Sequence, residues 1–525
     1  MVVLIAIGFL ALFPATGVQA HAGLEGSEPK PSSWLATSPS EIVLHFDESV
    51  SVTFARIIIF DQEGNEFTQF RPTRDEDDPT TVRANIDKLG DGTWVVVWRV
   101  ASADSHPVQG SFAFSVGTSS SDVTALLNGS LSNRHGLNNL FNVIRFVMFA
   151  GVLTLIGGVA LITFSSHAQL TVRTRMSLWG AWALATFASI EALLAYGPHA
   201  SGVKVYNFTD LSLLSDTMTT SFGQATLLRI SLLLAFVLLL MTVEYRAKKL
   251  WRFGAIGLSL TIAATLSAVG HPSGESLMAL SISLDVIHLL AASLWIGALF
   301  LIAIDRSNWL HSSLSMLRFS RIAGYSVAVI VITGSIQTFL LIDDPQNLVT
   351  TEFGQKLSVK VALVGVLIAM GGLSRKTIRK FGPAKLHQSV LVESLIALMV
   401  VGITALVVAL PPRDQASFAP VEASLSQSGL IADVTVTPAR VGAAEIHLVI
   451  GSLQGSFAQM SSVTARMSLP GKNIPMGPIV LEKTGPNHYT ALVNFAFAGK
   501  WNIEFLVKPE PTETVLFAFE IKVNE

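Results

Sequence analysis

Two patterns of hydrophobic and polar residues divide this chain into three parts. Between residues 41 and 117, apolar and polar positions alternate with the two-residue period of β-strands, as at Ile42, Leu44 and Phe46. From residue 139 to residue 410 the alternation gives way to long apolar stretches, and after residue 428 short alternating runs return. Because successive side chains of a strand point to opposite faces, this order predicts an all-β domain, a helical membrane domain and a second all-β domain.

The first part has the features of a small β-sandwich or barrel. Its alternating runs are separated by Gly, Asp, Pro and Asn, as in residues 75–79 and 90–92, which is the punctuation expected between short strands. Residues 118–133 are rich in Ser, Asn and Gly, as loops are. We therefore predict a β domain over residues 21–118, followed by a linker over residues 119–138.

The second part, residues 139–410, contains eight apolar stretches that are each long enough to cross a bilayer as a helix. They span residues 139–165, 176–197, 222–243, 253–270, 277–303, 321–343, 355–374 and 388–410. Short cytoplasmic loops carry an excess of Lys and Arg. The basic residues gather in the odd-numbered loops, at Arg173, Arg175, Arg246, Lys248, Lys249, Arg252, Arg306, Arg318, Arg375, Lys376, Arg379, Lys380 and Lys385. The even-numbered loops hold only Lys204. We therefore expect a multi-pass protein of the cytoplasmic membrane with both termini on the extracytoplasmic side.

The third part becomes polar again after two consecutive prolines at positions 411 and 412. A linker over residues 411–427 precedes short alternating strands, with Gly, Pro and Asn in the turns. This pattern predicts a second β-sandwich over residues 428–525. Five of its side chains are of metal-binding types, but ordinary core or surface positions are the favoured interpretation for them: His447, Met460, Met467, Met476 and His488.

The start of the chain resembles an export signal. Residues 2–17 form an apolar run that Pro14 and Gly17 interrupt, and small residues follow it up to Ala20. We predict a signal peptide over residues 1–20, which makes His21 the first residue of the mature protein. A free α-amine and an imidazole on one residue can chelate Cu(II), because that metal favours nitrogen donors of both kinds. The alternative is that a histidine merely happens to follow the cleavage site.

A second pair of candidate ligands lies at Asp104 and His106. In extended backbone, side chains two residues apart project from the same face. Together with the amine and imidazole of His21, they would make a set of three nitrogens and one oxygen that suits tetragonal Cu(II). An ordinary exposed loop is the alternative for this pair taken alone.

Composition narrows the possible functions. The chain of 525 residues is 50% hydrophobic and only 14% charged, where soluble proteins carry nearer a quarter, so much of it is expected in lipid. A net charge of −2 gives no argument for binding nucleic acid. The chain has no cysteine, which excludes disulfides, thiolate metal sites, a cysteine nucleophile and a lipoprotein anchor. No phosphate-binding G-x-x-x-x-G-K-[ST] motif is present, so the chain carries no ATPase of that type.

Three motifs of the first part resemble the periplasmic copper-binding protein CopC. They are the run of nine residues that starts at His21, the strand at residues 41–50, and the run Ser105-His-Pro-Val-Gln-Gly-Ser-Phe. The resemblance covers residues 21–118 in order. It implies that His21, Asp104 and His106 occupy the Cu(II) ligand positions of that family.

Five charged residues lie within the predicted membrane helices, at similar depths from their outer ends: Arg145, Glu191, Arg229, Asp285 and Lys360. Such residues are costly in lipid and usually face the interior of a bundle. Ion pairs between helices, such as Glu191 with Arg229, are the favoured interpretation for the arginines and the lysine.

Histidines near the outer ends of these helices are candidates for a transport path. His135 stands before the first helix, while His199 and His271 lie at the ends of the second and fourth. Asp285 and His288 share a face of the fifth helix because they are three residues apart. We predict that this pair gates the metal, with His288 as ligand and a carboxylate orienting its other nitrogen. The competing interpretation pairs Asp285 with Arg145 or Arg229 and leaves His288 as a packing residue.

The membrane part also resembles the CopD copper-transport domain. The matching runs begin at Asp285, Arg318 and Thr351, and Glu393 opens the eighth helix. The resemblance implies copper movement across the membrane, usually as uptake, and adds Glu191, Lys360 and Glu393 as candidates along the path. The C-terminal sandwich is similar to the YtkA-like domains of related copper proteins.

These observations favour a copper-binding membrane protein over an enzyme. It would capture Cu(II) outside the cytoplasmic membrane and transport copper across it, contributing to copper homeostasis and resistance. Its expected partners are the copper ion, the lipid bilayer and periplasmic copper chaperones, with no nucleic acid. One alternative is a copper oxidase or monooxygenase with an N-terminal histidine brace, although the Asp104 carboxylate would occupy a position that oxygen needs. Another is a membrane-anchored copper sensor or sequestration protein, for which one or two helices would suffice.

Overall fold

The computed structural model describes most of the chain and leaves out its first 21 residues. The described residues are 22–31, 33–75, 77–103, 105–117, 135–164, 170–202, 210–270, 277–310, 313–342, 345–410, 421–437, 439–452, 460–470, 474–485, 487–509 and 514–523. The predicted signal peptide and the loop at residues 118–134 therefore lie outside the described residues.

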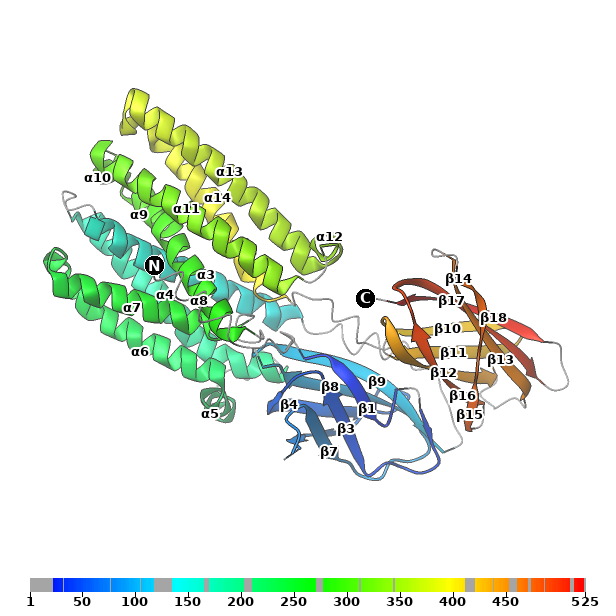
Figure 1. The fold of residues 1–525 in the computed structure, drawn as a ribbon. Helices are drawn as coiled ribbons and strands as arrows, with labels where there is room; N and C mark the ends of the chain where they lie inside the picture. The colour runs from blue at the N-terminus through cyan, green and yellow to red at the C-terminus, as the bar shows by residue number, and fades with distance from the viewer. Residues whose placement is uncertain are drawn as a thin grey trace. The chain divides into compact units, whose positions relative to one another are not determined.

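The N-terminal domain is a β-sandwich, as the alternating pattern predicts (Figure 1). One sheet has the strand order β1-β3-β7-β6 and the other has the order β2-β9-β8-β4-β5. The strands are β1 (Leu24–Glu28), β2 (Trp34–Leu35), β3 (Glu41–Phe46), β4 (Ser51–Phe60), β5 (Glu66–Phe70), β6 (Thr73–Arg74), β7 (Thr81–Asn85), β8 (Gly92–Ala101) and β9 (Pro107–Val116). Alternate residues of these strands, such as Ile42 and Leu44, fill a shared core between the sheets.

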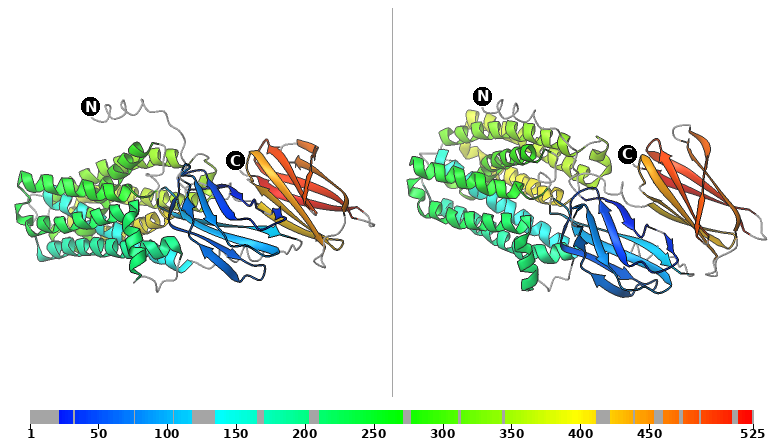
Figure 2. Two further views of the ribbon diagram at one scale, coloured as in Figure 1. Left: turned by 90° about the horizontal axis from the view of Figure 1, so that it is seen from below. Right: turned by 60° about the horizontal axis from the view of Figure 1, so that its bottom comes forward.

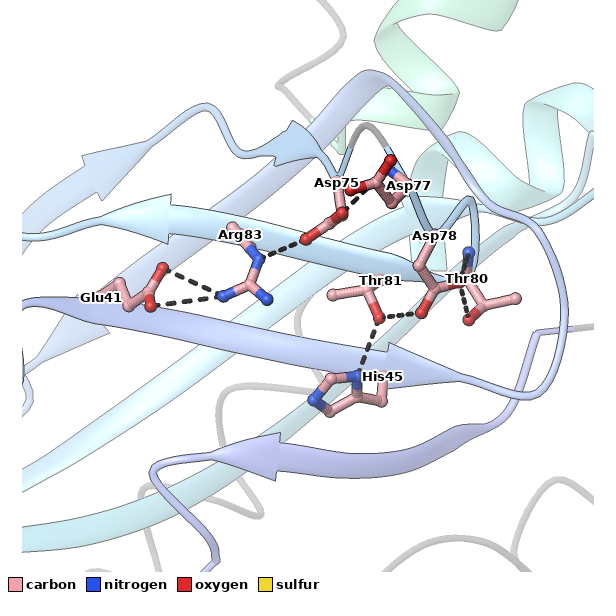
Figure 3. A network of polar contacts seen from close by, with 8 residues as sticks. All are labelled: Glu41, His45, Asp75, Asp77, Asp78, Thr80, Thr81 and Arg83. Atoms are coloured by element: carbon pink, nitrogen blue, oxygen red, sulfur yellow. Dashed lines mark hydrogen bonds and ion pairs between the residues drawn. The ribbon is translucent and has the colours of Figure 1, made fainter.

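One face of the first sheet carries a polar network (Figure 3). The Arg83 guanidinium on β7 pairs with Asp75 at 2.6 Å and with Glu41 at 3.3 Å. His45 on β3 is half-buried, with its Nδ1 2.8 Å from the hydroxyl of Thr81, which itself donates to Asp78. His45 therefore occupies a sheet face and has a hydrogen-bond partner there.

The central domain contains eight helices that are long and apolar enough to span a membrane, as predicted, counted over the described residues (Figure 1). The helical elements are α3 (His135–Phe164), α4 (Val172–Ser201), α5 (Leu211–Thr219), α6 (Ser221–Met241), η2 (Val243–Tyr245), α7 (Lys249–Ser267), α8 (Met278–Ala292), η4 (Ser293–Gly297), α9 (Ala298–Ile304), α10 (Arg306–Trp309), α11 (Ser313–Leu341), α12 (Asn347–Thr350), α13 (Glu352–Phe381), η5 (Pro383–Leu386) and α14 (His387–Val407). The prediction that His135 precedes the first helix is wrong, because α3 starts at His135. No proline or cap interrupts the polar turn ahead of the apolar run, so the helix continues through it.

Glycines allow the backbones of α3 and η4 to pack in direct contact. The fifth span is continuous from α8 through η4, a π-helical turn, into α9. A Cβ added at Gly297 would overlap the backbone carbonyl of Leu153 on α3, and one added at Gly157 would overlap the carbonyl of Ser293. Small residues at helix contacts are the usual means of close packing in membranes. The two glycines therefore lock α3 against the π-helical turn.

Replacing Gly297 with Ala is expected to destabilise the bundle severely. The added methyl group meets backbone atoms that cannot rotate away, so α3 and η4 must separate. Gly371 on α13 is a matched control, because nothing lies within 4 Å of a Cβ built there. The thermal unfolding midpoint in detergent should fall clearly for Gly297→Ala and should stay level or rise for Gly371→Ala. Equal midpoints for the two variants would contradict this packing.

The C-terminal domain is a second β-sandwich, and its two sheets form separate layers (Figure 2). The strand orders are β10-β11-β12-β16-β15 and β14-β13-β17-β18. The strands are β10 (Val421–Gln427), β11 (Leu430–Thr437), β12 (Gly442–Ser452), β13 (Met460–Leu469), β14 (Ile474–Ile479), β15 (Glu482–Gly485), β16 (His488–Phe495), β17 (Gly499–Pro509) and β18 (Val515–Val523). Met460 and Met467 pack against the core between the layers, as favoured from the sequence.

The predicted linker over residues 411–427 is partly wrong, because β10 occupies residues 421–427. Ser428 and Gly429 both have positive φ, at 53° and 79°. Two such residues form the tight hairpin turn whose twist matches that of paired strands. This turn folds β10 back onto β11 and adds a strand to the sheet.

Candidate metal centre

The turn between β3 and β4 is bonded to both segments that carry the predicted Cu(II) ligands. The Asp47 carboxylate accepts a hydrogen bond of 2.6 Å from the backbone N–H of Gly23, two residues after His21. The neighbouring Glu48 carboxylate accepts one of 3.2 Å from the backbone N–H of Ala103, the residue before Asp104. One turn thus holds the backbone at Gly23 and at Ala103 to the same end of the sandwich.

The predicted ligands differ in how far they can be placed. His21 and Asp104 lie outside the described residues. His106 stands directly before β9, and its side chain is 7% exposed. Ser105, which lies between Asp104 and His106 in the sequence, has a φ of 70°, in the left-handed region that residues with a Cβ seldom adopt. This backbone conformation gives the loop a sharp turn between Asp104 and His106.

Asp47 is a polar residue of this site that the sequence reasoning missed. Burial raises the pKa of its carboxyl from the ordinary 3.8 to about 6, although the hydrogen bond from Gly23 acts in the opposite direction. Its second oxygen, Oδ2, is buried and has no hydrogen-bond partner among the described residues. The only signal in the sequence is its place in the strand motif shared with CopC, which does not by itself assign a role.

Asp47→Asn is expected to stabilise the metal-free β domain above pH 6 and to have little effect below about pH 4. Ionising a carboxyl whose pKa is raised to about 6 by folding opposes folding, so the wild-type domain loses stability as pH rises from 4 to 6. Asparagine keeps the acceptor for Gly23 but carries no charge. Urea unfolding of residues 21–118 at pH 4 and pH 7.5 would measure both differences. A variant that is equally stabilised at both values would contradict the burial of the charge.

A polar cluster inside the bundle contains Asp285 and His288 on α8. Asp285 accepts hydrogen bonds from Ser267 on α7 at 2.6 Å and from Gln337 on α11 at 3.2 Å. His288 Nδ1 lies 2.9 Å from the hydroxyl of Thr333 on α11. Asp285 and His288 on α8 therefore contact two residues of α11, Gln337 and Thr333, which are four positions apart. Both side chains face a neighbouring helix, as the spacing predicts.

The hydrogen bonds of Thr333 decide which nitrogen of His288 carries the proton. The hydroxyl of Thr333 donates its single proton to the backbone carbonyl of Val329, at 2.8 Å. It must therefore accept from His288, which places the imidazole proton on Nδ1. Nε2 then keeps its lone pair, and no described residue forms a hydrogen bond with it. A neutral imidazole of this tautomer can bind a metal through Nε2.

Two predictions about the partners of polar residues inside the helices are wrong. A hydroxyl, not a carboxylate, orients His288, because Asp285 is already bonded to α7 and α11. Arg229 is fully buried, and it binds Thr265 at 3.1 and 2.8 Å and the sulfur of Met148 at 3.1 Å rather than Glu191 or Asp285. Glu191 is half-buried on α4. The hydrogen bonds of the guanidinium therefore go to uncharged acceptors on α3 and α7.

The other candidates along the path fall in separate places. His199 is buried near the end of α4 and stacks on Phe141 of α3, with ring centroids 4.6 Å apart. It belongs to an aromatic cluster distinct from the polar cluster around His288. His271 lies outside the described residues, and of His135 only the backbone is described. Lys360 on α13 is within electrostatic range of Asp285 and His288.

Glu393 lines a cavity of about 310 Å³ between α9, α11, α13 and α14. Its carboxylate accepts hydrogen bonds from Ser374 at 2.5 Å and from Ser389 at 2.7 Å. The rest of the lining is largely apolar. Within the described ranges, no group of three or more His, Asp or Glu side chains is close enough to hold a metal ion.

Comparisons with known families agree with this division of the chain. The CopC domain matches residues 24–117. The copper resistance protein D-like N-terminal domain matches residues 137–278, and copper resistance protein D matches residues 314–407.

Individual relatives cover either the whole chain or its first domain. The copper transport protein CutJ of Bacillus subtilis (strain 168) is 24% identical over 98% of this chain and 93% of its own length. Copper resistance protein C of Pseudomonas syringae pv. tomato is 34% identical over 19% of this chain and 82% of its own. The crystal structure of CopC from Methylosinus trichosporium OB3b is 27% identical and covers 19% of this chain and 97% of that one, with a TM-score of 0.18. With a CopC domain followed by both parts of a copper resistance protein D domain, this multi-pass membrane protein belongs to the CopC–CopD family of copper resistance proteins.

Proposed function

We propose that this protein captures Cu(II) outside the cytoplasmic membrane and passes copper inward through its helical bundle. The observation that carries the proposal is the turn at Asp47 and Glu48, which accepts hydrogen bonds from the backbone of Gly23 and of Ala103. The amine and imidazole of His21, the Asp104 carboxylate and the His106 imidazole are the proposed ligands. Asp47 is proposed to support this set, because it is bonded to Gly23 and its second oxygen has no partner among the described residues.

The bundle supplies the second part of the proposal. His288 offers Nε2 to the ion, while Thr333 fixes the ring and Asp285 places carboxyl oxygens on the same helix. An ionisable pair within a membrane helix marks a transport path more often than a packing contact, because hydrocarbon makes its presence costly. His135, His199 and His271 are proposed stations between the outer domain and this pair. Glu191, Lys360 and Glu393 are proposed to line the path further along.

Uptake is the proposed direction, with both β domains on the extracytoplasmic side. The predicted export signal and the basic odd-numbered loops support the position of the β domains. The resemblance to the CopD transport domain, which is usually associated with uptake, supports the direction. The whole-length similarity to a protein named for copper transport agrees with movement of the metal and not only its storage.

Copper content of cells with and without this chain tests the proposal. Cells that make the protein should accumulate more copper from low external Cu(II) than cells that make Gly297→Ala, which serves as a packing-defective control. Lower copper content in the producing cells would show export and overturn the direction. Unchanged content, with the protein present in the membrane, would overturn transport.

A further inference from the structure

The outer face of the five-stranded C-terminal sheet carries two histidines on neighbouring strands. His447 on β12 stands opposite Thr435 on β11 and opposite Thr490 on β16. His488 on β16 stands opposite Val449, two residues along β12 from His447. Residues directly opposite each other share a face, so both histidines project from the same side as diagonal neighbours. Such neighbours lie about 7–8 Å apart at the backbone, within reach of long side chains.

This face is not the one that forms the core of the sandwich. The core is built by the alternate residues of the same strands, such as Ile446 and Leu448. Even so, His447 is only 6% exposed and His488 only 2%. Buried polar side chains normally have their hydrogen-bonding groups satisfied. For a buried imidazole on the outer face of a sheet, each ring nitrogen is therefore expected to have a partner.

The two nitrogens of His447 have different surroundings. Nε2 lies 3.3 Å from the carboxylate of Glu445, two residues earlier on the same strand and the same face. A carboxylate oxygen accepts hydrogen bonds, so the ring N–H on Nε2 faces Glu445. Nδ1 is buried and has no hydrogen-bond partner among the residues that the structure describes. With the ring proton on Nε2, the unpartnered Nδ1 presents a lone pair.

We propose that His447 Nδ1 and the imidazole of His488 bind one Cu(I) ion on this face. A carboxylate that holds one nitrogen of a histidine while the other faces a metal is the usual arrangement around metal-ligating imidazoles. This site is additional to the proposed outer Cu(II) site and to the path through the bundle, and it does not depend on transport.

The number of donors selects the metal. Structural zinc needs four ligands, and calcium needs six to eight oxygens. The described part of the chain gathers no group of three or more His, Asp or Glu. Cu(I) has a filled d shell and accepts two donors in a near-linear arrangement, and imidazole is among the ligands that suit copper. A pair of imidazoles as the donors therefore favours monovalent copper over zinc or calcium.

The test is Cu(I) stoichiometry of the full chain in detergent, without oxygen and against a chromophoric Cu(I) chelator. The starting protein carries one extra residue ahead of His21, so that the outer site does not contribute. His447→Gln and His488→Gln should each bind one copper fewer per chain than this protein. His45→Gln is the matched control, since His45 is a half-buried histidine on a sheet face with a hydroxyl partner. It should bind as much copper as the starting protein.

Two further measurements keep the outcome decisive if a histidine variant unfolds. Glu445→Gln should keep the fold and weaken the affinity of this one site about tenfold or more, the effect expected for the partner of a ligating histidine. X-ray absorption of the starting protein should show imidazole scattering that is lost in His488→Gln. Unchanged stoichiometry in both histidine variants, an equal loss in His45→Gln, or unaltered affinity in Glu445→Gln would each overturn the site.

Discussion

Replacing His288 with Leu is expected to reduce copper accumulation by cells to the level of cells without the protein. The substitution removes Nε2, the one imidazole nitrogen of the polar cluster that has a lone pair available, while leucine preserves bulk within the membrane. Membrane insertion and Cu(II) binding by the outer domain should persist, because neither requires a group on α8. Accumulation of isotopically labelled copper, normalised to the protein in the membrane, measures the effect.

Two sets of variants separate a ligand role from a packing role. His387→Leu is the matched control, because His387 is an exposed residue at the start of α14. Thr333→Val removes the acceptor for Nδ1–H and should lower accumulation, while Thr333→Ser keeps the hydroxyl and should restore it. Normal accumulation in a stably inserted His288→Leu protein would assign His288 to packing alone.

Adding one alanine ahead of His21 is expected to weaken Cu(II) binding by the outer domain by more than about 100-fold, the upper range for losing only the partner of a ligand. The extra residue moves the free amine away from the imidazole of His21, so a chelating pair of nitrogens becomes a single one. Competition titration of residues 21–118, together with the electron paramagnetic resonance spectrum, would report both the affinity and the loss of a nitrogen ligand.

Asp104→Asn and His106→Gln provide the comparison, since each removes one donor and leaves the amine intact. Either should weaken binding less than the added alanine does. If the extended domain binds Cu(II) with its original affinity and spectrum, the amine is not a ligand and the proposed set of donors fails.

The fold could be predicted wherever periodicity alone decides it. Alternation identifies both sandwiches, and apolar length identifies eight spans, because burial of side chains sets both patterns. The missed strand β10 depends instead on a turn at Ser428 and Gly429, where two residues adopt positive φ. Serine seldom does so, although the dipeptide Ser-Gly is itself a turn signal. The start of α3 at His135 was missed because helices extend past the apolar run that identifies them.

The candidate site was predictable only within single segments. The three-residue spacing places Asp285 and His288 on one face of α8, and in the structure both side chains contact α11. Their partners Ser267, Thr333 and Gln337 lie on other helices, and no local pattern reveals which helices meet. The same holds for Asp47 and Glu48, whose bonds to Gly23 and Ala103 span 24 and 55 residues of sequence.

The uneven packing of the bundle has a mechanical consequence. In the most apolar 18-residue stretch of α3, 72% of the residues are buried, and glycines fix this helix against η4. In the corresponding stretches of α11 and α13, only 11% and 6% of the residues are buried. Lipid solvates apolar side chains as well as protein does, so helices with few contacts are cheap to displace. The bonds from His288 to Thr333 and from Gln337 to Asp285 join α11 to α8, which continues into the π-helical turn packed against α3. An ion bound at His288 would alter the contacts between α8 and α11. Binding of the ion would therefore be coupled to the position of α11 relative to α8.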